Sequence, residues 1–224
     1  MYKRQVDPGK EYISSLLKKG KAVITANKDI IADAGTDLIH TAKDNNACLY
    51  FEAAVAAGIP VLKPLIESLR GEELSKVLGI INGTSNYMLT AMEEGSTYED
   101  ALSTAQELGY AEPDPTNDVE GLDAKYKAVI LSLLCFGVSP SSEELFTDGI
   151  SKITKEDFEW AARLGKTIKL VAQIDNKNGF NARVHPVLID TKHPLAAIRG
   201  ALNAVVVEGD NICLLYTSPS PRDL

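Results

Sequence analysis

Apolar side chains in the first 50 residues follow two different spacings. Residues 11–19 carry them at helical intervals, and a glycine then separates this segment from the short apolar run 22–25. A second helical pattern spans 30–42 and precedes another short apolar run at 48–51. Helices that alternate with short strands are typical of a parallel sheet. We therefore expect residues 6–50 to be the C-terminal part of a doubly wound α/β domain.

Helix and strand signals are mixed in the rest of the chain. The run 79–84 predicts a buried strand and a tight turn, with Ser85 placed to cap the helix that follows. Thr97 stands three residues before Asp100, a spacing that predicts a capping box and a helix over 98–108 closed by a glycine. This part of the chain is therefore expected to be α+β rather than doubly wound.

Four further segments complete this α+β domain, which we place at residues 51–213. Helical spacing spans about 119–136 and about 155–171, whereas 182–188 and 204–208 have the character of strands. The second domain is therefore expected to be mixed α+β.

The two ends of the chain differ in character from everything between them. Residues 217–222 have neither helical nor strand periodicity, which is typical of a disordered tail. Residues 1–5 and 214–224 also resemble translated adaptor sequence of the kind found at the ends of unrelated gene fragments. We expect both ends to be foreign and the natural segment to be roughly 6–213.

The composition excludes several classes of protein. With 45% hydrophobic and 24% charged residues, the 224-residue chain is long and apolar enough to form a core. A formal net charge of -8 argues against nucleic-acid binding, which needs clustered lysine and arginine. The longest apolar stretch, 128–138, is far shorter than the roughly 20 residues of a membrane span. Three widely spaced cysteines indicate neither a disulfide framework nor a zinc site, and they fit a reducing cytoplasm.

An acidic loop leads into the predicted helix near the middle of the chain. Glu112 and Asp114 each precede a proline, which disfavours helix at the residue before it. Asp123 and Lys127 are four residues apart and would lie on one side of the helix, where an exposed pair of about 0.3 to 0.5 kcal/mol is common. Spacing alone favours that plain interpretation. The neighbouring carboxylates favour instead a ligand with an ammonium group, and a partly desolvated lysine that transfers a proton.

Two other segments have candidate binding residues. Lys28 stands where a strand meets a helix, which in open α/β sheets is the edge where ligands collect. Position alone does not distinguish a ligand-binding lysine from a solvated one. The small-residue turn 52–59 could direct backbone carbonyls at a cation, although tight packing explains its composition equally well.

Together these segments resemble the homoserine dehydrogenase family in order, spacing and residue type. The family's signature is matched by Ala105, Gly109, Tyr110, Asp118, Gly121, Asp123 and Lys127. Further similarity lies at 23–28, 51–60, 79–86, 148–150 and 184–186. The resemblance covers nearly all of 6–212.

This resemblance implies an oxidoreductase that interconverts L-homoserine and L-aspartate 4-semialdehyde with NAD(P), in the biosynthesis of threonine, methionine and isoleucine. It implies an NAD(P)-binding domain followed by a substrate-binding and dimerisation domain, in a cytoplasmic homodimer. Lys127 would be the acid/base lysine, Lys28 would face both substrate and nicotinamide, and Lys125 would have no catalytic part. The other residues carried over are Glu112, Asp118, Asp123, Thr84 and Tyr110 for substrate, Gly109 and Thr25 with Lys28 for cofactor, and the carbonyls of Glu52, Val55, Ala57 and Ile59 for a structural sodium ion.

The chain departs from the family's pattern in two places. It contains no G-x-G-x-x-G, and the glycine-rich segment expected after the strand 205–208 is replaced by a different sequence. We expect the first βαβ unit to lie upstream, and the chain alone to bind cofactor poorly and to be inactive.

Two alternatives remain open. One is another NAD(P)-dependent amino-acid dehydrogenase of similar layout, which the acidic loop disfavours. The other is a non-catalytic dimerisation or regulatory module with the same fold. Joint retention of Lys28, Glu112, Asp123 and Lys127 disfavours such a module, because it would not need all four.

Overall fold

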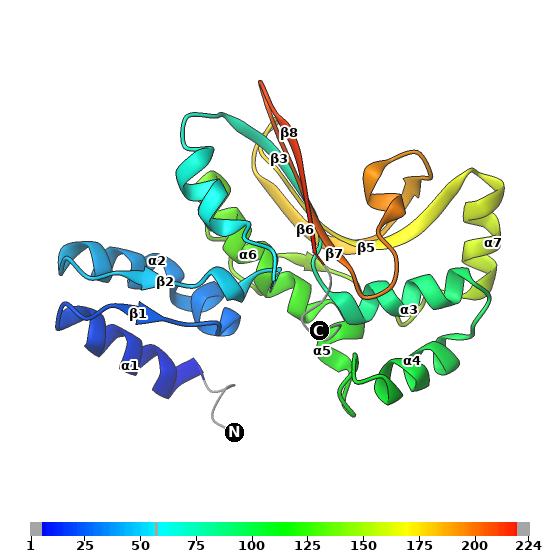
Figure 1. The fold of residues 1–224 in the computed structure, drawn as a ribbon, viewed down its shortest axis with the longest axis horizontal. Helices are drawn as coiled ribbons and strands as arrows, with labels where there is room; N and C mark the ends of the chain where they lie inside the picture. Colours follow the sequence, from blue (N-terminus) through cyan, green and yellow to red (C-terminus); the bar gives the residue numbers. More distant parts are fainter. Residues whose placement is uncertain (1–5, 57, 219–224) are drawn as a thin grey trace.

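The first body of the protein is a small parallel α/β unit. The computed structural model describes residues 6–56 and 58–218, and Figure 1 shows this unit at the blue end of the chain. Its elements are α1 (Val6–Lys18), β1 (Val23–Ile24), α2 (Lys28–Asp44) and β2 (Leu49–Tyr50). The two strands pair in parallel, with Val23 opposite Leu49. The predicted order of helix and strand and the predicted parallel pairing are confirmed.

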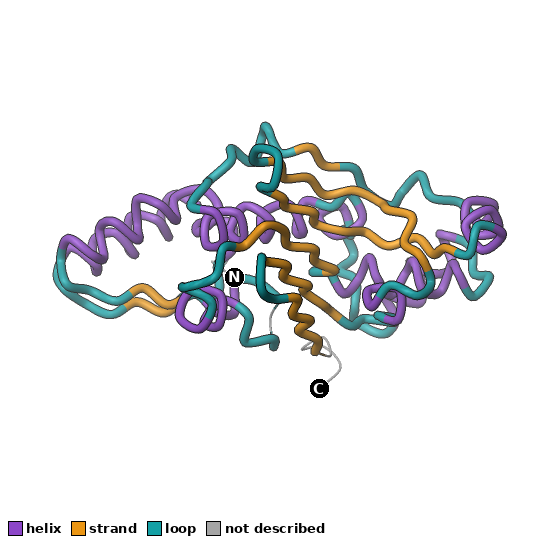
Figure 2. The backbone as a smooth tube through the Cα atoms, turned by 90° about the horizontal axis from the view of Figure 1, so that it is seen from above, coloured by secondary structure: helices purple, strands orange, loops and turns teal. Residues whose placement is uncertain are grey.

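The second body is built on a six-stranded sheet. Its strands are β3 (Leu74–Ile80), β4 (Phe146–Thr147), β5 (Lys166–Asp175), β6 (Asn181–Asp190), β7 (Asn203–Gly209) and β8 (Cys213–Ser218). Their order in the sheet is β4, β6, β5, β3, β7, β8. Figure 2 shows the strands side by side from above. Only β4 and β6 pair in parallel among these described strands. The second body is therefore the α+β domain that we expected, and it contains a substantial, mainly antiparallel sheet.

Helices cover one face of this sheet. They are α3 (Gly83–Glu93), α4 (Tyr98–Glu107), α5 (Thr116–Val119), α6 (Leu122–Phe136) and α7 (Lys155–Arg163), with short η1 (Glu52–Ala54), η2 (Pro64–Ser68) and η3 (Pro194–Ala197) in the connections. The opposite face is partly covered by the segment 191–202, which contains η3 (Figure 1). Leu195 and Ile198 of that segment pack with Ile80 and Val171 of the sheet. Among the described helices none combines the length and apolar character of a membrane span.

Helix α6 joins the two bodies. Its residues Ala128 to Leu131 are buried in the main core, and the helix packs on the sheet and on α2. The approach of α2 is close, because a Cβ added at Gly35 would lie 3.2 Å from Leu133 Cδ2. The position of the α/β unit relative to the sheet is therefore set largely by side-chain packing along α6.

The long helix predicted over 119–136 is interrupted. Gly121 has a φ of 75°, so the chain leaves the helix after α5 and restarts it as α6. A glycine adopts this left-handed conformation at little cost. Because the apolar residues keep helical spacing on both sides of Gly121, the periodicity of the sequence does not reveal the break.

The helix predicted over 155–171 is wrong in its second half. α7 ends at Arg163, Gly165 has a φ of 68°, and the following residues form β5. Residues 167–172 are buried on both faces of the sheet. A continuous apolar run of this kind does not distinguish a buried strand from a buried helix by periodicity.

Two further corrections concern residues 79–85 and the C-terminal end. The strand begins earlier than predicted, at Leu74, and the cap of α3 is Asn82 rather than Ser85. Residues 213–218 form β8, paired antiparallel to β7, so the expectation that 217–222 has no strand structure is wrong at residues 217 and 218. The predicted foreign residues 1–5 and 219–224 lie outside the described part of the chain.

Candidate active site

Three helix starts meet at one point between the two bodies. Lys28 opens α2 directly after β1, and Asn27 caps this helix by accepting the N–H groups of Asp29 and Ile30. The ammonium group of Lys28 lies 3.1 Å from Asp123 Oδ1, in the first turn of α6. A lysine at the carboxyl edge of the parallel strands is thus joined to a carboxylate of the second body.

Asp123 binds a second lysine with its other oxygen. Lys127 Nζ lies 2.5 Å from Asp123 Oδ2 and also donates to the Ile81 carbonyl at 2.7 Å. The side chains of Asp123 and Lys127 are only 12% and 17% exposed. The interpretation of this pair as an ordinary exposed ion pair is therefore wrong, because tertiary packing buries it.

Asn82 bridges two carboxylates, and the sequence analysis did not identify it as a site residue. Its Nδ2 donates to Asp118 Oδ1 at 2.7 Å and to Asp123 Oδ2 at 3.0 Å, while its Oδ1 accepts the N–H of Ser85. The helix contact fixes the orientation of the amide, so the N–H groups must face the carboxylates. The signal was present in the sequence, since asparagine after a strand and before a helix is a preferred N-cap.

Electrostatics keep Asp123 ionised. Burial by itself raises the pKa of this carboxyl, but the ammonium groups of Lys127 and Lys28 and hydrogen bonds from Lys127 and Asn82 outweigh it. The pKa falls to about 2 from the ordinary 3.8. Asp123 is therefore a fixed negative charge between two cations at neutral pH.

The first turn of α3 ties the rest of the site together. Thr84 Oγ1 donates to the Tyr110 carbonyl at 2.6 Å, and Ser85 Oγ donates to the Asp118 carbonyl at 2.7 Å. The ring of Tyr110 stacks at a tilt on Tyr87, with centroids 4.9 Å apart. Thr84 and Tyr110, both predicted for substrate, are thus next to the segment that carries Asp118.

The remaining predicted residues lie around this cluster. Glu112 is exposed on the loop between α4 and α5, where Gln106 donates to its carbonyl. Gly109 has a φ of 78° just beyond α4, as predicted for a C-terminal cap. Thr25 follows β1 and accepts the N–H of Asn27. Lys125 forms no side-chain hydrogen bond or ion pair with any other described residue.

The turn predicted for sodium is described except for Ala57. Ala56 has a φ of 53°, and the N–H of Ile59 donates to its carbonyl. The carboxylate of Glu52 accepts the N–H groups of Leu62 and Lys63, one on each oxygen. Within the described ranges no cluster of three His, Cys, Asp or Glu side chains is suited to a metal ion.

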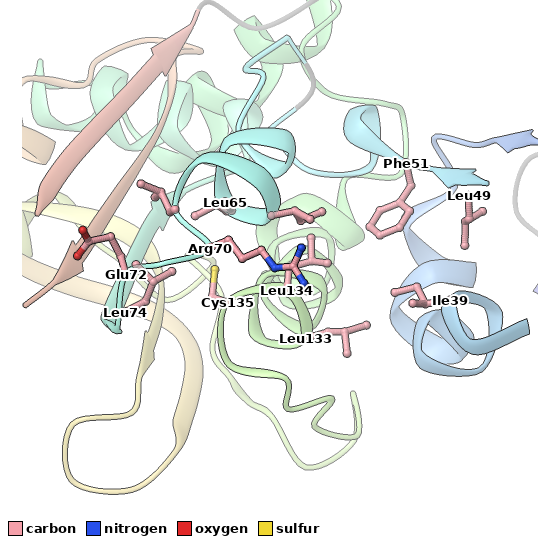
Figure 3. Close-up of a pocket in the computed structure, with 12 residues that line it drawn as sticks. Ile39, Leu49, Phe51, Leu65, Arg70, Glu72, Leu74, Leu133, Leu134 and Cys135 are labelled. Carbon is pink, nitrogen blue, oxygen red and sulfur yellow. The ribbon is translucent and has the colours of Figure 1, made fainter. Parts of the chain in front are cut away.

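A separate hollow of about 510 Å³ lies beside α6 (Figure 3). Mostly apolar side chains line it, including Ile39 of α2, Phe51, and Leu133 of α6, and Arg70 extends into it. None of the residues predicted for the site line this hollow. We assign the chemistry to the carboxylate and lysine cluster, because a proton-transfer site needs ionisable groups in contact.

The fold and the site together define a class of protein. A parallel α/β unit whose strand ends meet a separate α+β domain, with the polar cluster at the junction, is typical of two-domain nucleotide-dependent dehydrogenases. Residues 60–219 match the model of the family described as homoserine dehydrogenase. The chain belongs to the homoserine dehydrogenase family, as the resemblance in its sequence indicated.

Curated relatives agree with this assignment. Homoserine dehydrogenase of Lactococcus lactis is 46% identical over 210 residues, which are 93% of this chain and 49% of that protein. The enzyme of Bacillus subtilis is 45% identical over 210 residues, 92% of this chain and 48% of the relative. The chain therefore spans about half the length of the relatives that it matches.

Solved structures agree as well. A homoserine dehydrogenase from Thiobacillus denitrificans superimposes with a TM-score of 0.92 at 42% identity, over 96% of this chain and 51% of that one. A hyperthermophilic archaeal homoserine dehydrogenase in complex with NADPH gives a TM-score of 0.84 at 34% identity, over 95% of this chain and 62% of that one. The predicted fold class is confirmed.

Proposed function

We propose that the protein to which this chain belongs interconverts L-homoserine and L-aspartate 4-semialdehyde with NAD(P). The observation that carries the proposal is the buried Asp123, whose two oxygens bind Lys28 and Lys127 separately. Family membership supports it, because the curated relatives are named homoserine dehydrogenases. The alternative of a non-catalytic module does not account for two lysines held on one buried carboxylate.

Oxidation of homoserine removes a proton from its side-chain hydroxyl and a hydride from the carbon that bears it. Bound NAD(P)+ supplies the acceptor for the hydride. In our proposal Lys127 first gives up a proton to solvent, its neutral Nζ then accepts the hydroxyl proton, and Asp123 stabilises the ammonium group that results. In the reverse direction Lys127 returns this proton to the oxygen. Lys28, on the other oxygen of Asp123, places a second positive charge where negative charge develops on the substrate oxygen.

The carboxylates next to the pair of Asp123 and Lys127 suit the ammonium group of the substrate. We assign it to Asp118 and Glu112, with Asp123, Thr84 and Tyr110 completing the contact surface. Asn82 supports the assignment, because its bridge keeps Asp118 and Asp123 close together.

The cofactor is assigned to the edge from which Lys28 extends. Thr25 and Lys28 lie at the carboxyl end of β1, where nucleotides bind in parallel sheets. A Cβ at Gly109 would meet no atom within 4 Å, so space for a ligand is open beside it. The archaeal relative in complex with NADPH supports a nicotinamide cofactor.

We extend the proposal to a sodium ion and a homodimer. The sodium ion is assigned to the carbonyls of Glu52, Val55, Ala57 and Ile59, and the left-handed backbone of Ala56, which makes a tight turn in this segment, supports that assignment. Outside the cover of 191–202, the sheet face opposite the helices has the half-buried apolar side chains Leu78 and Val187. Sedimentation of the chain at increasing concentration would test association through that face.

A hybrid enzyme tests the catalytic assignment. Residues 6–213 would replace the matching segment of the Lactococcus lactis relative, and homoserine oxidation would be followed by NADPH absorbance. Lys127→Ala should lower kcat by roughly 10²- to 10⁴-fold, the contribution of a positioned acid or base. Lys125→Ala is the matched control, two residues away on the same helix, and should change kcat little. Equal losses at the two lysines would contradict the assignment.

A further inference from the structure

Lys169 is a buried lysine that takes no part in the site described above. It lies on β5, its exposed fraction is 0%, and its Nζ donates to the Ile198 carbonyl at 2.7 Å and to Asn86 Oδ1 at 3.4 Å. Burying an amine is costly unless it is hydrogen-bonded, so a lysine at this position calls for a structural or functional reason.

Asn86, which accepts a hydrogen bond from Lys169, also binds the backbone of residues 198–202. Its Nδ2 lies within 3.3 Å of three carbonyls in the connection between β6 and β7, those of Ile198, Gly200 and Leu202. The N–H of Gly200 also donates to Thr90 Oγ1, one turn further along α3. The segment 198–202 is thus bound to α3 through buried polar groups.

Charged side chains close this contact on the outside. Arg199 pairs with Glu93 at 2.7 Å and with Glu94 at 3.0 Å, both at the C-terminal end of α3. Glu93 and Arg199 are the charged groups whose fields reach Lys169. Since they neutralise one another, the amine lies in an environment with little net charge.

Helix α3 is also capped at its start by Asn82, the residue whose side-chain amide binds both carboxylates of the site. Asn86 is one turn after Asn82, and its N–H donates to the Asn82 carbonyl at 3.2 Å. Asn82 in turn holds Asp118 and Asp123. A movement of α3 at Asn86 would therefore be transmitted to the carboxylate cluster, because a packed helical turn moves as a unit.

We propose that Lys169 is a positioning residue, which through Asn86 fixes the first turns of α3 and so sets Asn82 against Asp118 and Asp123. For the substrate this inference rests on the proposed function, since homoserine is the ligand that those carboxylates would bind. The residues that determine the geometry of the site would then include Lys169 on β5, which acts through Asn86, one helical turn away from Asn82.

The protonation state of Lys169 provides a way to observe this coupling. Burial lowers the pKa of its ammonium group to about 8, while Glu93 raises it and Arg199 lowers it. The neutral amine has two N–H bonds for its two acceptors, and protonation adds a third N–H and a charge. Titration near pH 8 should therefore shift the position of α3 slightly.

Nuclear magnetic resonance on the chain itself tests the coupling. The side-chain amides of Asn86 and Asn82 and the Cε signals of Lys169, Lys28 and Lys127 would be followed from pH 6.5 to 9.5. The amide signals of both asparagines should shift with the midpoint of Lys169. A signal of Asn82 that stays constant, or follows only Lys28 or Lys127, would overturn the proposal, even if Asn86 follows Lys169.

Two matched variants extend the test to binding. Lys169→Met should abolish that part of the Asn82 titration and weaken homoserine binding by roughly 2- to 30-fold in calorimetry, the range for coupled packed sites. Lys166→Met, three residues earlier on β5, should alter neither. If Lys169→Met does not fold, the titration of the unmodified chain still decides the question. If the unmodified chain fails to bind homoserine, the proposed function is in doubt while the titration still tests the positioning role.

Discussion

Asp123 is the buried carboxylate to which the other polar groups of the site bind. A carboxylate buried in this way would lose its charge by itself, and it stays ionised because Lys127, Lys28 and Asn82 all bind it. The spacing in the sequence indicated only that Asp123 and Lys127 lie on one side of a helix. The participation of Lys28, 95 positions earlier in the chain, required the two bodies to be packed together.

The lowered pKa of Asp123 predicts a loss of stability in acid. A carboxyl whose folded pKa is about 2, against 3.8 for the ordinary group, stabilises the fold above pH 3.8 and loses that contribution as the pH falls toward 2. Between pH 5 and pH 3 the loss should be about 1 kcal/mol. Urea unfolding at both pH values should show this difference for the unmodified chain relative to Asp123→Asn. Asp37→Asn, at an exposed position of α2, should show the same loss of stability between pH 5 and pH 3 as the unmodified chain.

At the scale of elements, the break between α5 and α6 gives the site its shape. Gly121 turns the chain with a φ of 75°, so that Asp118 and Asp123 both face Asn82 instead of following one continuous helix. The loop after β4 supports the break from outside, since the N–H of Ile150 donates to the Val119 carbonyl at 2.7 Å. The position of this loop is therefore as important to the carboxylates as the helices that carry them.

Gly149 is the point in that loop where no side chain fits. A Cβ there would lie 2.1 Å from the Val119 carbonyl oxygen and 2.5 Å from the Glu120 Cα. Gly149→Ala should displace the turn between α5 and α6 and lower kcat of the hybrid enzyme by up to roughly 100-fold, the effect of a misplacement of about 1 Å. Gly71→Ala, where a Cβ would meet no atom within 4 Å, is the control. Similar rates for both variants would show that the turn tolerates the shift.

At the scale of the whole molecule, the site exists only where the α/β unit meets the sheet domain. Lys28 comes from the first body and Asp123 from the second, and α6 packs on both (Figure 1). The contact between α2 and α6 at Gly35 therefore determines whether the two groups meet.

A larger residue at Gly35 should separate the two bodies. Gly35→Val should push α2 away from Leu133, lower the free energy of unfolding by about 1 to 3 kcal/mol and weaken the pair between Lys28 and Asp123. Thermal unfolding would measure the first effect, and the Cε chemical shift of Lys28 the second. His40→Val, at an exposed position of the same helix, controls for the lower helix propensity of valine. If both variants behave alike, the contact at Gly35 does not position Lys28.

The sequence by itself determined part of the local structure and the candidate residues of the site. Helix caps such as Thr97 and stops such as Gly109 depend on neighbouring backbone groups, so they could be predicted from a few residues. Likewise the order of helix and strand in the first 50 residues followed from periodicity. The candidate residues Lys28, Asp118, Asp123 and Lys127 followed from their positions and from the resemblance to the family.

Only the tertiary structure decided where strands replace helices and which polar groups meet. β5 was predicted as helix because a strand buried on both faces has no alternation to reveal it. The burial of Asp123 with its two lysines, the bridge from Asn82 and the burial of Lys169 all depend on segments far apart in the chain. Contacts of this kind arise when the core excludes water, so local sequence patterns do not contain them.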